Sequence, residues 1–385
     1  MKTLLISEIF PPKTGGSGRW FFEVYSRLSR KDYIICAGND EEADAFDSGS
    51  DVNIIRLPLS LSDWGVINPK CMFAYLRLFL RILIIIRREG VEAIHCGRSL
   101  PEGLLGWLVW KFTKIPFLCY VHGEELATFQ KSRELVWLSR KVFTGATYII
   151  VNSRNTKRLL TDYLPTIEKK IQILHPGVNV NYFKPVSANK TIRSELGWKN
   201  RLVILTVGRL QRRKGHDVAI LSLKAVKNTF PNVLYAIAGA GEEREPLEHL
   251  VNEDGLNENV QFLGEIDDET LLKCYQQCDL FLLANREVDG DIEGFGMVLV
   301  EAQSCGKPVI AGDSGGTIET MIPGKSGLII DCRESTRLAT ALNQLLDESD
   351  TRKSMGRNAV KWVNENFDWN SLVVKAEDLF GNISR

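Results

Sequence analysis

One stretch of the chain, from Asp279 to Gly316, limits the possible folds most, because it reads as a β-α-β unit with a glycine-rich turn after each strand. A predicted strand at 280–283 leads through a polar loop to Glu293-Gly-Phe-Gly, and a short apolar helix at 297–304 and a second buried strand follow. Gly306 is typical of a helix C-terminus, since glycine adopts a positive φ without a Cβ penalty. In open α/β sheets, ligands bind at the carboxyl ends of the strands, where both turns lie.

Two glutamates of this unit, Glu293 and Glu301, are separated by seven residues. Glu301 lies in an apolar helical run, so we expect it to be buried, and a pair of ribose hydroxyls would satisfy both of its oxygens. Glu293 can reach forward into a cleft, and the free N–H groups of 294–297 form a helix N-terminus that attracts phosphate. The structural alternative is that Glu301 favours the helix dipole and Glu293 caps the helix.

The run Glu293-Gly-Phe-Gly-Met-Val-Leu-Val-Glu301 resembles the E-x7-E motif of retaining glycosyltransferases with the GT-B fold, glycosyltransferase family 4. The continuation Gly306-Lys-Pro-Val-Ile-Ala-Gly-Asp-Ser-Gly-Gly is similar to mannosyltransferases of the phosphatidylinositol mannoside type within that family. The resemblance implies the α/β class and the GT-B architecture, two Rossmann-like doubly wound domains facing across a cleft. It also implies that the glycine-rich start of the helix, Gly294, Phe295, Gly296 and Met297, and Glu301 bind the donor.

Length and composition agree with two domains. The chain has 385 residues, and its 48 basic and 48 acidic residues balance, so no global field favours nucleic acid. Eight cysteines show no metal-ligand pattern, which favours a reduced cytosolic compartment. We predict an N-terminal acceptor-side domain at 1–178, joined by a C-terminal helix at 366–385, and a nucleotide-sugar-binding domain at 179–365.

Short apolar strands alternate with helices throughout, which predicts parallel, doubly wound sheets. A helix is expected from Arg19, and the segment from Asn364 to Leu379 also reads as helical. The predicted strands are 3–9, 33–37, 52–57, 93–96, 115–121, 147–152, 171–174, 202–207, 235–238, 260–263, 280–283 and 308–311.

The first half contains two candidate site segments. Gly15 and Gly16 follow the first strand in a loop that lets backbone approach a ligand, although a flexible connector is the alternative. His122 follows a predicted strand directly, which favours a site over a structural role. The resemblance implies that Gly15 and Gly16 touch the donor diphosphate and that His122 bonds the hydroxyls of the transferred sugar.

The segment from Met72 to Ile86 is strongly apolar but short for a membrane span. Arg77 and Arg81 are four residues apart and share one helix face. We expect a helix packed on the core, and a helix lying on a membrane surface is the second interpretation.

The second half opens with a strand that delivers Gly208-Arg-Leu-Gln-Arg-Arg-Lys-Gly215, a basic loop able to bind an oxyanion. Family matching assigns the donor phosphates to Arg209 and Lys214, so Arg212 and Arg213 are expected to face solvent. By the same resemblance, the strand end at Gly264 holds the nucleotide base.

The triplet Asp289-Gly290-Asp291 has the form of the metal-binding D-x-D signature of the other major glycosyltransferase fold. There, two carboxylates hold a divalent cation that neutralises the leaving diphosphate. Here Arg209 and Lys214 already supply positive charge, so we expect no metal ligand and no cofactor.

These features predict a hexosyltransferase that acts without metal, with Glu293, His122, Arg209 and Lys214 as its catalytic residues. The expected donor substrate is a nucleotide-diphosphate sugar, GDP-mannose before UDP-sugars, and the expected acceptor is a lipid or glycan of the cell envelope. A sugar-nucleotide epimerase and a binding-only relative are the alternatives. A cytoplasmic location is expected, with peripheral membrane contact through the N-terminal domain and no nucleic-acid partner.

Overall fold

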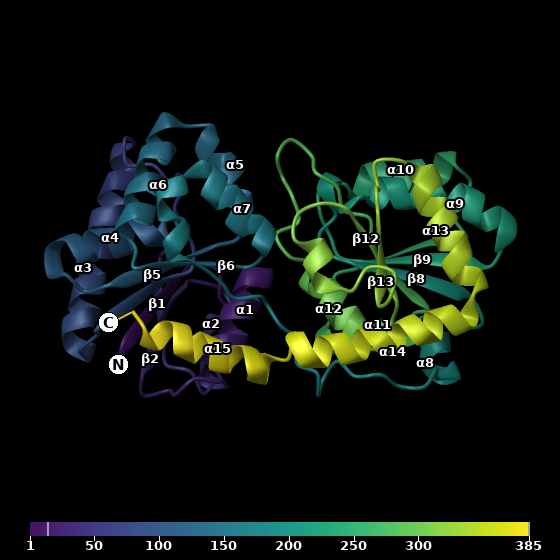
Figure 1. Ribbon diagram of the computed structural model, residues 1–385, viewed down its shortest axis with the longest axis horizontal. Coiled ribbons are helices and arrows are strands. Elements are labelled where there is room, and N and C mark those ends of the chain that lie inside the picture. The colour runs from purple at the N-terminus through teal and green to yellow at the C-terminus, as the bar shows by residue number, and fades with distance from the viewer. Residues whose placement is uncertain (14, 384–385) are drawn as a thin grey trace. The chain divides into compact units, whose positions relative to one another are not determined.

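The computed structural model describes residues 1–13 and 15–383, and Figure 1 shows its helices and strands. The chain divides into two compact units, Met1–Pro176 with Trp369–Arg385 and Gly177–Asp368. Each unit is a parallel sheet with helices on both faces, so the predicted α/β class of two Rossmann-like doubly wound domains is confirmed. The predicted domain limits and the cleft stay predictions, and residues 384–385 of the predicted last helix lie outside the described residues.

The first unit is built on seven strands in the order β3-β2-β1-β4-β5-β6-β7. Its strands are rich in Val, Ile and Leu because a parallel sheet is covered on both faces. They are β1 (Thr3–Ser7), β2 (Tyr33–Gly38), β3 (Ile54–Leu57), β4 (Ala93–Cys96), β5 (Phe117–Val121), β6 (Tyr148–Val151) and β7 (Ile171–Ile173). Its helices are α1 (Gly16–Tyr25), α2 (Ala43–Ser48), α3 (Pro69–Glu89), α4 (Glu102–Thr113), α5 (Glu124–Gln130), α6 (Arg133–Gly145), α7 (Arg154–Tyr163), the 3-10 helix η1 (Pro165–Lys170) and α15 (Trp369–Gly381).

The second unit repeats this plan with six parallel strands in the order β10-β9-β8-β11-β12-β13. The strands are β8 (Leu202–Val207), β9 (Val233–Ala238), β10 (Val260–Gly264), β11 (Leu280–Leu283), β12 (Val309–Gly312) and β13 (Gly327–Ile330), the last of which the sequence did not predict. The helices are α8 (Lys190–Glu195), α9 (His216–Thr229), α10 (Arg244–Glu253), α11 (Asp268–Gln277), α12 (Met297–Ser304), α13 (Ser335–Asp347), α14 (Ser349–Asn366) and the 3-10 helices η2 (Arg212–Lys214) and η3 (Thr317–Thr320).

Apolar side chains fill the space between each sheet and its helices. In the first unit, α3, α4, α6 and α7 cover one face of the sheet. On the other face α15 packs beside α1, and the Phe380 ring stacks on Tyr25 at 5.8 Å between centroids. In the second unit, α9, α10 and α13 cover one face, and α11, α12 and α14 cover the other.

Two helix boundaries differ from the prediction. The first helix begins at Gly16, three residues before the predicted Arg19, so Gly16 lies in the helix and not in the loop. The predicted helix at 364–379 is broken between α14 and α15. The break follows from packing, because Val178 N donates to Phe367 O (2.8 Å) and the buried Phe367 ring contacts Phe295 at 5.6 Å.

Helix α3 is longer than predicted and has two apolar faces. It begins where Asn68 accepts from Lys70 N (3.0 Å), and it ends at Gly90 in the left-handed conformation. One face, which includes Leu78 and Ile82, is buried in the core, which confirms the core-packed prediction for that face. The opposite face exposes five large apolar side chains, Met72, Phe73, Leu76, Leu80 and Ile84.

Candidate active site

The strand order of the second unit locates a natural binding point. Connections leave in opposite directions on either side of the β8/β11 pair, and ligands of doubly wound sheets bind beyond the carboxyl ends of such a pair. The basic loop at 208–215 follows β8, and the loop at 285–296 follows β11. Three predicted site residues, Arg209, Lys214 and Glu293, therefore lie at this switch point.

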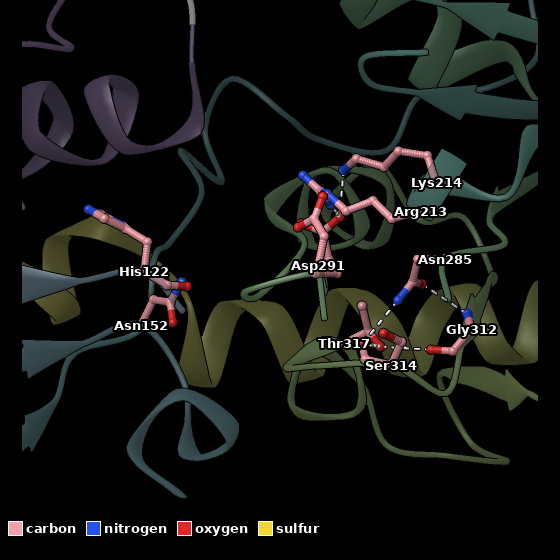
Figure 2. A network of polar contacts seen from close by, with 10 residues as sticks. His122, Asn152, Arg213, Lys214, Asn285, Asp291, Gly312, Ser314 and Thr317 are labelled. Carbon is pink, nitrogen blue, oxygen red and sulfur yellow. Dashed lines mark hydrogen bonds and ion pairs between the residues drawn. The ribbon is translucent and has the colours of Figure 1, made fainter. Parts of the chain in front are cut away.

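Glu293 is buried and bonded to two cations (Figure 2 shows both). Lys214 Nζ lies 2.5 Å from its Oε2 atom, and Arg213 Nη1 donates to the same oxygen at 2.7 Å. Burial alone would raise the pKa of Glu293, but Lys214 and Arg213 outweigh it and hold that pKa at about 2. The carboxylate is therefore ionised throughout the physiological range.

Lys214 shares this buried position, and burial lowers the pKa of its ammonium despite the attraction of Glu293. Arg213 adds to the lowering, because a second positive charge lies beside it. Arg209, from the start of the same loop, is exposed on the rim. The loop thus places two buried cations on Glu293, while Arg209 is exposed and acts electrostatically on Lys214.

The prediction that Arg213 faces solvent is wrong. Its side chain is 9% exposed, whereas that of Arg212 is 73% exposed, as predicted. The three-residue 3-10 helix η2 turns adjacent side chains to different sides, so one arginine points outward while the next points at Glu293. Arg213 Nε also forms an ion pair with Asp291 Oδ2 at 3.1 Å.

The backbone of Glu293 is held by the glycine loop that follows β12. Gly316 N donates to Glu293 O at 2.9 Å. Gly315 has φ +68°, and a Cβ built on it would lie 1.8 Å from Glu293 O. Only glycine permits this approach, which explains why a Gly-Gly pair follows the strand.

Asn285 and Thr317 brace the glycine loop (Figure 2). Asn285 Oδ1 accepts from Gly312 N, and its Nδ2 donates to Ser314 O, both at 3.0 Å. Thr317 Oγ1 contacts Gly312 O at 2.8 Å. Sequence reasoning missed both residues, and the available signal was that Asn285 comes directly after the buried segment of β11.

The start of α12 offers backbone donors. Gly294 and Met297 are half-buried, and Gly296 is the N-cap with φ +93°, so the first N–H groups of the helix have no intrahelical acceptor. The Phe295 side chain is in the core, which leaves only its backbone for a ligand. Figure 1 shows α12 on one face of the sheet.

Glu301 is buried, as predicted. Tyr275 Oη donates to its Oε2 atom at 2.7 Å. A ribose would therefore share this carboxylate with a protein hydroxyl instead of satisfying both oxygens alone. Gly264 ends β10 on the same rim, and its carbonyl accepts from Gly239 N at 2.7 Å.

The first unit holds the remaining predicted residues at its own rim. Gly15 and Gly16 are exposed at the start of α1. His122 follows β5, and its Nε2 atom lies 2.9 Å from Gly97 O. A carbonyl only accepts, so Nε2 carries a proton and donates it to Gly97 O.

The His122 backbone is also fixed. His122 N donates to both carboxylate oxygens of Glu125, and Asn152 Nδ2 donates to His122 O at 2.9 Å (Figure 2). The ring lies edge-on to Trp20 and Phe21, with centroids 5.7 and 5.9 Å away. The imidazole is thus held rigidly at the strand end.

Two family models match the chain. Residues 188–362 match the model described as Glycosyl transferases group 1, and residues 14–182 match the model described as Glycosyltransferase Family 4.

Curated relatives match most of the chain. A GDP-mannose-dependent alpha-(1-6)-phosphatidylinositol monomannoside mannosyltransferase of Mycolicibacterium smegmatis is 27% identical over 384 residues, which cover 98% of this chain and 97% of the relative. A D-inositol 3-phosphate glycosyltransferase of Corynebacterium jeikeium is 32% identical over 300 residues, which cover 72% of this chain and 70% of the relative.

Solved structures share the fold at lower identity. The Anabaena protein HepE, solved in complex with UDP, is 20% identical with a TM-score of 0.84, over 99% of this chain and 100% of that one. A sucrose-phosphate synthase from Thermosynechococcus elongatus is 21% identical with a TM-score of 0.81, over 100% of this chain and 99% of that one.

We predict that Gly315→Ala destabilises the second unit by about 2–4 kcal/mol, because the new methyl group would meet Glu293 O and displace it. Gly324→Ala is the matched control, since Gly324 also has a positive φ (+75°) but has nothing within 4 Å of the added methyl. Urea unfolding of both variants gives the comparison. Equal losses of unfolding free energy in the two variants would show that the positive φ alone, and not the close approach to Glu293 O, requires glycine at position 315.

We also predict a pH-dependent role for Glu293 in stability. Its folded pKa of about 2 lies below the usual 4.5, so its stabilising contribution is present above pH 4.5 and is lost as the pH falls toward 2. Glu293→Gln should lower the unfolding free energy at neutral pH by about 3–5 kcal/mol, because the buried Lys214 loses its carboxylate partner and Arg213 keeps only Asp291.

The difference in unfolding free energy between wild type and Glu293→Gln should shrink between pH 4.5 and pH 2. Denaturant unfolding at a series of pH values measures it, with Glu287→Gln, an exposed position of the same loop, as the control. A difference in unfolding free energy that stays constant from pH 4.5 to pH 2 would contradict the lowered pKa of Glu293.

Proposed function

This chain is a GT-B glycosyltransferase with a family 4 domain and a glycosyl transferases group 1 domain, and from that premise we propose that it transfers mannose from GDP-mannose to a lipid or glycan acceptor. The predicted family resemblance and the assignment as a transferase enzyme are thereby confirmed. The epimerase and binding-only alternatives gain no support, since the relatives described above are named as transferases.

The observation that carries the proposal is the charge arrangement at the β8/β11 switch point. A leaving diphosphate develops negative charge, and preorganised donors that face it supply the largest catalytic contribution. We assign that role to Arg209, Lys214 and the N–H groups at the start of α12. We assign Glu293 and His122 to the sugar hydroxyls, and Gly15 and Gly16 to the diphosphate.

Glu293 suits hydrogen bonding better than covalent attack. A carboxylate with a pKa of about 2, shared by two cations, is a weak base and a weak nucleophile. We therefore propose retention by front-face attack. The bond from the anomeric carbon to the diphosphate oxygen breaks, a bond to the acceptor oxygen forms on the same face, and the acceptor proton passes to the departing phosphate.

We propose that the reaction needs no metal ion. The ion pair between Asp291 and Arg213 supports this, because it gives one carboxylate of the D-x-D triplet a cationic protein partner. Arg209 and Lys214 supply the positive charge that a divalent cation would otherwise bring.

GDP-mannose is preferred as donor because the full-length relatives at 27–28% identity are named GDP-mannose-dependent. The contacts assigned here involve the pyrophosphate and the sugar, which GDP- and UDP-sugars have in common. A UDP-sugar-dependent glucosyl or N-acetylglucosaminyl transfer is therefore the second candidate, and a donor panel separates the two.

We propose a lipid-linked acceptor, met at the inner face of a membrane from the cytoplasm. No helix in the described part of the chain is long and apolar enough to cross a membrane. The exposed face of α3 supports surface contact instead, because Phe73, Leu76, Leu80 and Ile84 form a stripe at helical spacing. Basic residues accompany the stripe, namely Lys70, Arg77, Arg81, Arg87 and Arg88 on α3 and Lys111 and Lys114 on and beside α4.

Lys214→Ala should lower kcat for transfer roughly 30- to 1000-fold, because one preorganised donor to the leaving diphosphate is lost. This fall corresponds to an increase of about 2–4 kcal/mol in the activation free energy. Lys224→Ala, which removes an exposed lysine of α9, should leave kcat unchanged. Transfer from GDP-mannose and UDP-glucose to a lipid acceptor panel measures this effect. Turnover of Lys214→Ala within threefold of wild type would refute its role.

The membrane face has its own test. The double variant Phe73→Ser/Leu80→Ser should bind anionic vesicles at least about tenfold more weakly in co-sedimentation. It lacks two exposed apolar side chains that would be buried in the lipid when the protein binds. Leu221→Ser, an exposed leucine of the second unit, is the control. Salt should also weaken binding by wild type. Equal binding of all three proteins, or none by wild type, would exclude this surface.

A further inference from the structure

Arg213 is a buried cation to which the proposed reaction gives no role. Its guanidinium lies between two carboxylates from one loop, with Nη1 at 2.7 Å from Glu293 Oε2 and Nε at 3.1 Å from Asp291 Oδ2. Figure 2 labels Arg213 and Asp291. Asp291 is 48% exposed, so this chain of charges runs from the protein surface to the buried Glu293.

A second set of contacts ties the same loop to η2. Arg286 N donates to Arg213 O at 2.8 Å, and the Arg286 guanidinium binds both oxygens of Asp217 at 2.7 and 2.8 Å. The backbones of Val288 and Asp291 bond each other in both directions. The loop at 286–291 is thus anchored to the segment that carries Lys214.

We propose that Arg213 is a positioning residue for Glu293, and that Asp291 is the second anchor that fixes the Arg213 guanidinium. This inference rests on the proposed function, in which Glu293 bonds the donor sugar. Both cations contact Oε2, and among the described residues no side chain bonds Oε1, so the arrangement leaves Oε1 as the oxygen that can accept from a sugar hydroxyl. A planar guanidinium holds two carboxylates at fixed angles, which a lysine cannot do.

The geometry favours positioning over a direct contact with the diphosphate. The Arg213 side chain is almost fully buried, and two carboxylates already neutralise it. Arg209 is exposed at the start of the same loop and is the better placed of the two for an incoming anion.

The test uses two matched pairs in the full-length protein, Arg213→Gln with Arg212→Gln and Asp291→Asn with Asp289→Asn, together with Arg213→Lys. We expect kcat for transfer to fall about 10- to 100-fold in both Arg213 variants, because a misplaced catalytic group costs about that much. In Asp291→Asn we expect a smaller fall of about threefold to tenfold, since one anchor remains. The dissociation constant of GDP should stay within about twofold of wild type in all variants, and the Arg212 and Asp289 controls should match wild type.

Several results would overturn the inference. A weaker affinity for GDP in Arg213→Gln would make Arg213 a diphosphate ligand. A wild-type kcat in Arg213→Lys would show that Arg213 only supplies positive charge beside Glu293 and does not position it. Equal losses in Asp289→Asn and Asp291→Asn, restored by added Mn²⁺, would favour a metal site. If Arg213→Gln does not fold, unchanged kcat in Asp291→Asn overturns the inference by itself. Wild-type protein that transfers from no donor would instead refute the proposed function.

Discussion

The burial of Glu293 beside two cations is the interaction on which the candidate site depends. Moving an isolated charge into a protein interior is strongly unfavourable, so none of Glu293, Lys214 and Arg213 could be buried without the others. Lys214 and Glu293 are 79 residues apart in sequence, and their contact requires the loops after β8 and β11 to be aligned. The site is therefore a product of the sheet order as much as of its side chains.

Close backbone contacts between the rim loops make this alignment possible. A Cβ on Gly215 would lie 1.8 Å from Ala284 O, and a Cβ on Gly312 would lie 1.6 Å from Asn285 O. Together with Gly315 against Glu293 O, these contacts lock the loops of three neighbouring strands, β8, β11 and β12, into one layer. The glycines thus act as spacers at sites where any side chain would separate the loops.

Much of the fold followed from local pattern, because buried parallel strands are short apolar runs between helices. The strands at 202–207 and 280–283 were predicted to the residue, and the burial of Glu301 followed from its apolar neighbours. The orientation of Arg213 could not be predicted, because four cations in one loop carry no period that separates inward from outward. Tyr275 was missed for a related reason, since its partner Glu301 is 26 residues away.

The different chemistry of arginine and lysine suggests different roles for the two buried cations, Arg213 and Lys214. Asp291 and Glu293 balance Arg213 and Lys214 in formal charge, so Lys214 would meet a diphosphate chiefly as a hydrogen-bond donor whose charge Glu293 partly offsets. Arg213 is held between two carboxylates by a rigid fork, and turning it would break both contacts. Lys214 has a flexible stem and several donors, so it can contact Glu293 and a phosphate oxygen together. In the proposed reaction, a fixed arginine and an adaptable lysine on one carboxylate oxygen would therefore let the site bind an anion without losing the orientation of Glu293.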